Sequence, residues 1–119
     1  MRPQNRDMAS LFDMLDAARS AVQFTQGRRF EDLLADRMLR SAVERALAII
    51  GEAARRVSPE TRESLTDVPW RSMIGLRNVL AHEYDEIRHE ILWTVCIDKL
   101  PTLIRQLEDM GVDNPPEQD

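Results

Sequence analysis

The fold is decided by residues 30–57, which read FEDLLADRMLRSAVERALAIIGEAARRV. Apolar residues recur there at alternating steps of three and four, which is the spacing of one face of an α-helix. One such stripe consists of Leu39, Val43, Ala46, Ile50, Ala54 and Val57, and a second consists of Leu34, Met38, Ala42, Ile49 and Ala53. A helix that is apolar on two faces is buried on two sides. We therefore predict one long central helix whose second side is covered by a partner subunit.

Two further segments show the same helical spacing. In residues 6–25 the apolar stripe consists of Met8, Leu11, Leu15, Ala18 and Val22, and Gly27 ends the pattern. In residues 86–110 the stripe consists of Leu92, Cys96, Leu100, Leu103 and Leu107, and Gly111 ends it. Pro101 interrupts the second pattern and predicts a kink, because proline lacks the N–H that would bond back one turn.

Shorter segments connect these helices. Ser58 followed by Pro59 is typical of a helix cap with proline at the first helical position, so a short helix is expected there. Another helix is expected over residues 70–82, and the sequence shows no strand-like alternation. We therefore predict an all-α fold, a four- to five-helix up-and-down bundle.

The chain has the length and composition of one globular domain. Its 119 residues are 43% apolar and 31% charged. We predict one helical domain over residues 1–112 and a disordered acidic tail over residues 113–119. No apolar run approaches the roughly 20 residues of a membrane span, so we expect a cytoplasmic protein without a membrane partner. Cys96 is the one cysteine, which excludes an internal disulfide and favours a core position for its side chain.

The charge of the chain limits how it can bind nucleic acid. A net charge of -5 argues against broad, non-specific binding, which requires a basic face. All of the basic residues except Lys99 are arginines, whose planar guanidinium group suits bidentate contact with phosphate or carboxylate. The arginines therefore have two interpretations, which are phosphate contacts and salt bridges along exposed helix faces.

Residues 77–84, RNVLAHEY, combine a cation, an amide, an imidazole and a phenol. On a helix of about 100° per residue, Asn78 and His82 stack on one face and Arg77 lies beside them. Tyr84 returns close to the side of the arginine if the helix continues that far. The residues expected to face the core instead are Met73, Leu76, Val79 and Leu80.

These side chains suit cleavage of RNA by attack of its own 2′-hydroxyl group on the neighbouring phosphorus. The reaction needs a base, an acid and a cation, and histidine serves as base or acid near neutral pH. Arg77 would stabilise the developing charge, and Asn78 would hold a phosphate oxygen or orient His82. No metal ion or other cofactor is required. The same residues also fit a structural role, because histidine is common at helix ends.

The stretch 77–84 resembles the R-x-x-x-x-H-x-Y signature of the HepT-like HEPN family. The resemblance extends over residues 8–108, nearly the whole chain. Matching positions outside the signature are Ile50-Gly51-Glu52-Ala53, Pro69-Trp70, Gly75, Asp85, Ile87, Trp93 and Leu100-Pro101. Glu52 has two interpretations, as a partner of an active-site arginine or as an ordinary carboxylate at a buried edge.

The resemblance implies a homodimeric helical bundle in which the motifs of two subunits face each other across a cleft. It implies a toxin ribonuclease that cuts tRNA or mRNA, with Arg77 and His82 as the catalytic pair and Asn78 as their support. It also implies an antitoxin, a MntA-like nucleotidyltransferase that transfers AMP to Tyr84. The added phosphate and nucleoside would repel and block the RNA.

Two classes of function remain open at this point. One is the ribonuclease, in which one His82 acts as base while its symmetry mate acts as acid. The other is a non-catalytic HEPN module that binds nucleotide or RNA, or serves as the helical partner of a nucleotidyltransferase. Arg77 and His82 together favour the enzyme, because a binding module does not need this pair.

Overall fold

A computed structural model of the chain describes the backbone of residues 5–81 and 86–112 and the side chains of residues 6–81 and 88–112. The described residues contain helices and no strand, which confirms the predicted all-α fold. The elements are α1 (Asn5–Thr25), α2 (Phe30–Ala35), α3 (Arg37–Arg56), α4 (Pro59–Ser64), α5 (Trp70–Ile74), α6 (Leu76–Ala81), α7 (Glu86–Thr94), the π-helical turn η1 (Val95–Lys99) and α8 (Leu100–Asp109). The predicted tail, residues 113–119, lies outside the described residues. Within the described part, no helix is both long and apolar enough to cross a bilayer.

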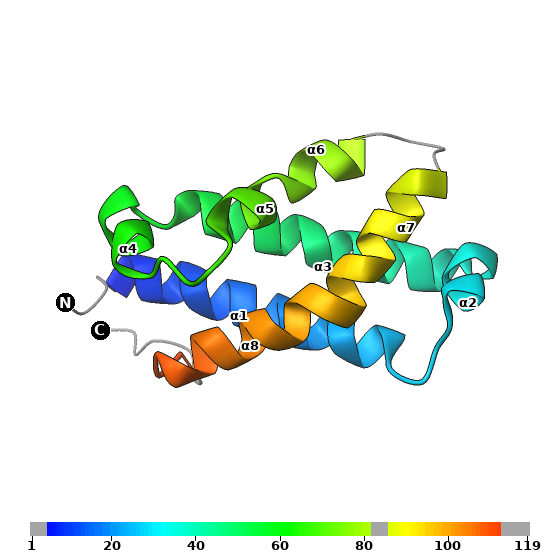
Figure 1. The fold of residues 1–119 in the computed structure, drawn as a ribbon, viewed down its shortest axis with the longest axis horizontal. Helices are drawn as coiled ribbons and strands as arrows, with labels where there is room; N and C mark the ends of the chain where they lie inside the picture. The colour runs from blue at the N-terminus through cyan, green and yellow to red at the C-terminus, as the bar shows by residue number, and fades with distance from the viewer. Residues whose placement is uncertain (1–4, 82–85, 113–119) are drawn as a thin grey trace.

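The helices form a bundle around α1 and α3 (Figure 1). These two helices run antiparallel and side by side, and they share the largest contact between elements. Helix α8 lies along α1, while α5 and α6 lie over α3. The short helices α2 and α4 lie at the two ends of α3. Up-and-down packing of this kind agrees with the predicted architecture.

The single long helix predicted over residues 30–57 is in fact two helices, so that prediction was wrong. Asp36 separates α2 from α3 and has an extended backbone. Its side chain accepts a hydrogen bond from the backbone N–H of Leu39 at 3.1 Å, which caps the start of α3. The apolar spacing continues through this break, and the spacing alone therefore did not show it.

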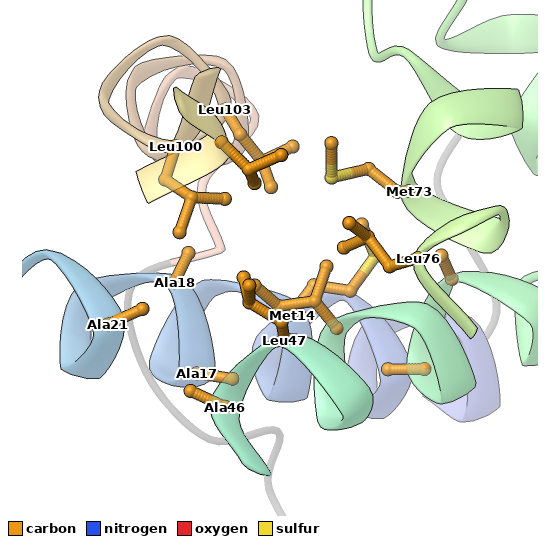
Figure 2. Packing of buried hydrophobic residues seen from close by; sticks show 14 of the residues in the cluster. Met14, Ala17, Ala18, Ala21, Ala46, Leu47, Met73, Leu76, Leu100 and Leu103 are labelled. Carbon is orange, nitrogen blue, oxygen red and sulfur yellow. The ribbon is translucent and has the colours of Figure 1, made fainter. Parts of the chain in front are cut away.

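The core forms where α1, α3, α5, α6 and α8 meet (Figure 2). Its fully buried large side chains include Met14, Leu47, Met73, Leu100 and Leu103. Small residues line the contact between α1 and α3, where Ala17 and Ala46 lie against each other. Each fully buried leucine or methionine stabilises the fold by about 1.5–3 kcal/mol relative to an exposed one. The same core therefore holds α5 and α6 in place.

The two apolar stripes predicted on α3 differ in burial. The first stripe is buried along its whole length. The second ranges from Ala53, which is fully buried, to Met38, whose exposed fraction is 83%. A third face, which neither stripe contains, packs against α5 and α6 and includes Gly51. The chain's own helices thus cover much of α3, and cover by a partner subunit stays a prediction.

The irregularity that Pro101 predicts occurs as a π-helical turn just before it. The backbone N–H of Leu100 bonds back five residues, to the carbonyl oxygen of Val95. The wider turn accommodates a residue that has no N–H to donate. Cys96 is buried in this turn, and burial raises the pKa of its thiol to about 12. It is therefore a neutral core side chain at physiological pH, as predicted.

A buried carboxylate joins the start of α1 to the start of α4. Asp7 is only 4% exposed and accepts hydrogen bonds from the backbone N–H of Ser58 at 3.0 Å and from the Ser58 hydroxyl at 2.7 Å. The Thr61 hydroxyl donates a third bond to the same carboxylate. Burial alone would raise the pKa of Asp7, but the bonds from Thr61 and Ser58 outweigh it and leave this pKa lowered.

Asp7→Asn is expected to lower the free energy of unfolding by about 1–3 kcal/mol at pH 7, because buried donors lose a charged acceptor. The folded-state pKa lies below the unfolded value of about 3.9, so the stabilisation is complete above that value. It disappears as the pH falls through the lower folded pKa. Urea unfolding of both proteins at neutral pH and at progressively more acidic pH measures the difference. Asp16→Asn, an exposed change on α1, is the control, and a gap that widens in acid would contradict this assignment.

Candidate active site

The segment that precedes the motif is anchored by Trp70. Its indole Nε1 donates a hydrogen bond to the carbonyl oxygen of Leu65 at 2.9 Å, which fixes the start of α5. Met73, one turn later, is buried in the core. The helix predicted over residues 70–82 is interrupted at Gly75, which ends α5 before α6 begins at Leu76. This break was not predicted, although the glycine that produces it was among the family matches.

Gly51 allows α6 to lie directly against α3. A Cβ atom at this position would lie 3.1 Å from the Met73 carbonyl oxygen and 3.7 Å from the Leu76 Cβ. It would also lie 3.8 Å from the backbone nitrogen of Arg77. Glycine within a helix costs about 0.5–1 kcal/mol relative to alanine. The close approach gives a physical reason for glycine here, and it fixes the backbone from which the Arg77 side chain projects.

Helix α6 separates core residues from candidate site residues as predicted. Leu76 is buried, and Val79 and Leu80 are half-buried. Arg77 and Asn78 are exposed, and both line the same groove. His82 and Tyr84, which complete the predicted site, lie outside the described residues. The structure therefore brings together Arg77 and Asn78 of the four predicted site residues.

The groove next to Arg77 and Asn78 has a volume of about 950 Å³. It extends over α4, α5 and α6 and reaches the end of α3. Of the described residues, the charged ones that line it are Arg55, Arg62, Glu63, Arg71 and Arg77. At least four cations thus line one hollow in a chain whose net charge is -5. Such a concentration of one sign of charge in a groove attracts an anionic ligand.

Three arginines outside the groove form ion pairs. Arg19 pairs with Glu108 at 2.6 Å, Arg28 with Asp36 at 3.9 Å, and Arg88 with Glu44. None of the four groove arginines forms an ion pair with a residue that the structure describes. The salt-bridge interpretation therefore applies to Arg19, Arg28 and Arg88, and phosphate contact by the groove arginines stays a prediction. Sequence reasoning did not single out Arg55, Arg62 or Arg71, because their proximity depends on the packing of three helices.

Glu52 does not pair with the groove. Its side chain is exposed on α3 and makes no ion pair with the described residues. It therefore pairs with no arginine that the structure describes, and a role as partner of an active-site arginine stays a prediction. The match at this segment of α3 is explained by Gly51, whose lack of a side chain brings α6 close.

A second polar hollow, of about 570 Å³, lies beside Leu80 and is lined by Glu44, Arg88 and His89. Arg37 and Arg40 line it as well, whereas the charge of Arg88 is neutralised by its pair with Glu44. The His89 Nε2 lies 3.4 Å from an Arg88 guanidinium nitrogen. Among residues 6–81 and 88–112, no group of three or more His, Cys, Asp or Glu side chains is arranged to hold a metal ion. The groove at Arg77 is therefore the better candidate site.

Comparisons with known proteins show the family to which the chain belongs. A family model described as "Ribonuclease HepT-like" matches residues 14–110. "Putative RNase MJ1380" of Methanocaldococcus jannaschii is 38% identical over 100 residues, which cover 84% of this chain and 92% of that protein. "Probable ribonuclease HepT" of Thermococcus cleftensis is 33% identical over 100 residues, which cover 84% of this chain and 91% of that protein. No solved structure is a significant match. The chain therefore belongs to the HepT-like ribonuclease family.

Proposed function

We propose that this protein is a metal-independent ribonuclease whose catalytic pair is Arg77 and His82, with Asn78 as a supporting phosphate ligand. The observation that supports it most is the exposure of Arg77 and Asn78, side by side in sequence, on a groove lined by four arginines. An unpaired arginine in a groove is poised for the charge that develops on a phosphate. Membership of the family agrees with ribonuclease activity.

The proposed reaction needs only the RNA and side chains of the protein. The 2′-hydroxyl oxygen attacks the adjacent phosphorus while its proton moves to a neutral His82 imidazole. The bond from phosphorus to the 5′-oxygen then breaks, and an imidazolium gives its proton to that oxygen. The products are a 2′,3′-cyclic phosphate and a free 5′-hydroxyl group. Arg77 stabilises the negative charge of the phosphorane between these two steps.

The purified protein is expected to cut single-stranded RNA in the presence of EDTA and to leave 2′,3′-cyclic phosphate ends. Mass spectrometry of the fragments identifies these ends, since hydrolysis by a metal-activated water leaves linear phosphates. The variant His82→Ala, purified in the same way, is the control for a contaminating nuclease. Cleavage that stops completely on chelation would contradict the mechanism. Absence of cleavage under all conditions would favour the non-catalytic module.

We also propose that two copies of the chain act together. Acid and base at one phosphate are most simply supplied by two His82 side chains, one from each subunit. Met38, a member of the second apolar stripe of α3, is exposed, which supports contact of this surface with a second copy of the chain. Analytical ultracentrifugation measures the oligomeric state directly, and a fully active monomer would contradict the proposal.

The biological role proposed is that of a cytoplasmic toxin that cuts tRNA or mRNA. Its antitoxin would be a MntA-like nucleotidyltransferase that inhibits the toxin by transferring AMP to Tyr84. Tyr84 follows His82 by two residues, so an added nucleotide would lie next to the RNA. After incubation with ATP and a nucleotidyltransferase encoded beside this chain, we expect the mass of AMP on Tyr84 and loss of cleavage. Tyr84→Phe should remain active in that mixture, and its equal inhibition would contradict the proposal.

A further inference from the structure

The groove at Arg77 extends well beyond the proposed catalytic residues. Arg77 and Asn78 line it from α6, whereas Arg62 lines it from α4. Figure 1 shows α6 and α4 at opposite ends of this edge of the bundle, with α5 between them. Arg71 lies on α5, between the two ends. The hollow therefore leads from the proposed site in one direction along the protein.

We propose that this groove is a track for single-stranded RNA in which Arg55, Arg62 and Arg71 bind phosphates on one side of the scissile bond. This inference rests on the proposed ribonuclease function and adds the path of its substrate. The three arginines are binding residues that contact the strand away from the reacting phosphate. The bound strand extends from Arg77 along α5 toward α4.

The arrangement of charge in the groove supports binding of a polyanion. None of these arginines has a carboxylate partner among the described residues, so their guanidinium groups are available to a ligand. Arg62 is also held in place, because its Nε donates a hydrogen bond to the carbonyl oxygen of Val57 at 3.1 Å. Cations assembled around a hollow repel one another, and phosphates of a bound strand relieve that repulsion.

An aromatic side chain also lines the groove. Trp70 is half-buried there, and its hydrogen bond to Leu65 fixes the orientation of the ring. Proteins that bind single strands combine a positive groove for the backbone with aromatic rings on which bases stack. An acidic peptide would use the arginines but would have no base to stack on Trp70. The combination therefore favours a nucleic acid strand.

The volume of the groove also fits several nucleotides. A volume of about 950 Å³ is at the upper end of the 300–1,000 Å³ range of pockets that enclose a drug-sized molecule. A single phosphate would leave most of it empty, and four arginines exceed what one phosphate can engage. Several consecutive nucleotides fit both the volume and the number of cations.

The test measures binding separately from cleavage. A fluorescent, unstructured 2′-O-methyl RNA binds but has no free 2′-hydroxyl group to react, so fluorescence anisotropy reports its Kd alone. For Arg55→Gln and Arg71→Gln, loss of one phosphate contact is expected to weaken binding roughly fivefold at 0.1 M salt. The slope of log Kd against log salt should fall by about 0.7 for each variant. Arg45→Gln is the matched control, because Arg45 is exposed on α3 and does not line the groove.

Glu63→Gln provides a test of opposite sign. Among the residues that the structure describes, Glu63 is the one acidic side chain that lines the groove, so its neutralisation is expected to tighten binding of the same RNA. Partial unfolding would weaken binding, and it therefore cannot imitate this result. Each arginine variant lowers the net charge by one unit, so a difference from Arg45→Gln depends on position in the groove. Glu63→Gln raises the net charge by one unit, and Glu31→Gln, an exposed change on α2 outside the groove, is its matched control.

The outcomes separate this inference from the proposed function. If the wild-type protein cuts RNA but the groove variants bind like Arg45→Gln, the track is overturned and the ribonuclease stands. If the wild-type protein binds the probe through the groove but never cuts RNA, the track stands and the ribonuclease is overturned. If the wild-type protein neither binds nor cuts RNA, both are overturned.

Discussion

Arg77→Gln is expected to lower the rate of RNA cleavage roughly 10²–10³-fold, which is the usual cost of removing one donor that stabilises a developing oxyanion. The free energy of unfolding should change by less than about 0.5 kcal/mol, because the side chain is exposed and has no ion-pair partner among the described residues. Glutamine keeps a polar side chain of similar reach but removes the charge. Single-turnover cleavage and urea unfolding of the same preparation measure the two effects.

Two variants make the result specific to Arg77. Arg45→Gln changes the net charge equally on an exposed surface of α3 and should cut at the wild-type rate. Arg77→Lys keeps the charge but not the planar fork of donors, so intermediate activity is expected. Wild-type activity in Arg77→Gln would exclude this residue from the reaction. A loss of stability parallel to the loss of activity would instead indicate a structural role.

Gly51→Val is expected to lower the free energy of unfolding by about 1–3 kcal/mol, as is typical when a methyl group is forced into a packed contact. The first carbon of the new side chain would already lie 3.1 Å from the Met73 carbonyl oxygen. That oxygen belongs to the backbone of α5 and cannot rotate away as a flexible side chain would. Because α5 and α6 must shift, cleavage should fall together with stability. Urea unfolding gives the first quantity, and cleavage at a temperature where the variant is folded gives the second.

Gly51→Ala separates the steric cost of a side chain at this position from the effect of glycine's backbone freedom. Alanine favours a helix over glycine by about 0.5–1 kcal/mol, which offsets part of the cost of the tight contact. The stability of Gly51→Ala should therefore lie closer to that of the wild type than the stability of Gly51→Val. If the valine variant is as stable as the wild type, α3 and α6 are not packed as closely as the structure indicates.

Apolar spacing predicted helices correctly where a helix meets the core with one face only. The segment predicted over residues 6–25 is observed as Asn5–Thr25. The last helical segment ends as Gly111 predicts, because its positive φ of 83° lets the N–H of Val112 bond back to the Leu107 carbonyl oxygen at 3.1 Å. Spacing did not show the breaks at Asp36 and Gly75, since the apolar pattern continues across both.

Part of the candidate site could be predicted from the local sequence pattern, and part depends on packing between helices. The order of residues 77–84 predicted that Arg77 and Asn78 would leave the core side of their helix, and both are exposed. The matched segment around Glu52 depends on packing as well. The Glu52 side chain is exposed, while its neighbour Gly51 lets α6 lie close to α3.

The amino-acid sequence by itself established the helical class, the ends of the first and last helical segments, the residues proposed for the reaction and the family. The helices and the proposed site depend on residues that are near one another in the chain, within the reach of helical hydrogen bonds and side-chain periodicity, and the family depends on the order of such matches along the chain. The three-dimensional packing was needed to bring Arg55, Arg62 and Arg71 to one groove with Arg77. These residues belong to four helices, and their proximity follows from how closely α5 and α6 approach α3 at a residue without a side chain. No spacing along the chain encodes that distance, because it is set by contacts between segments far apart in sequence.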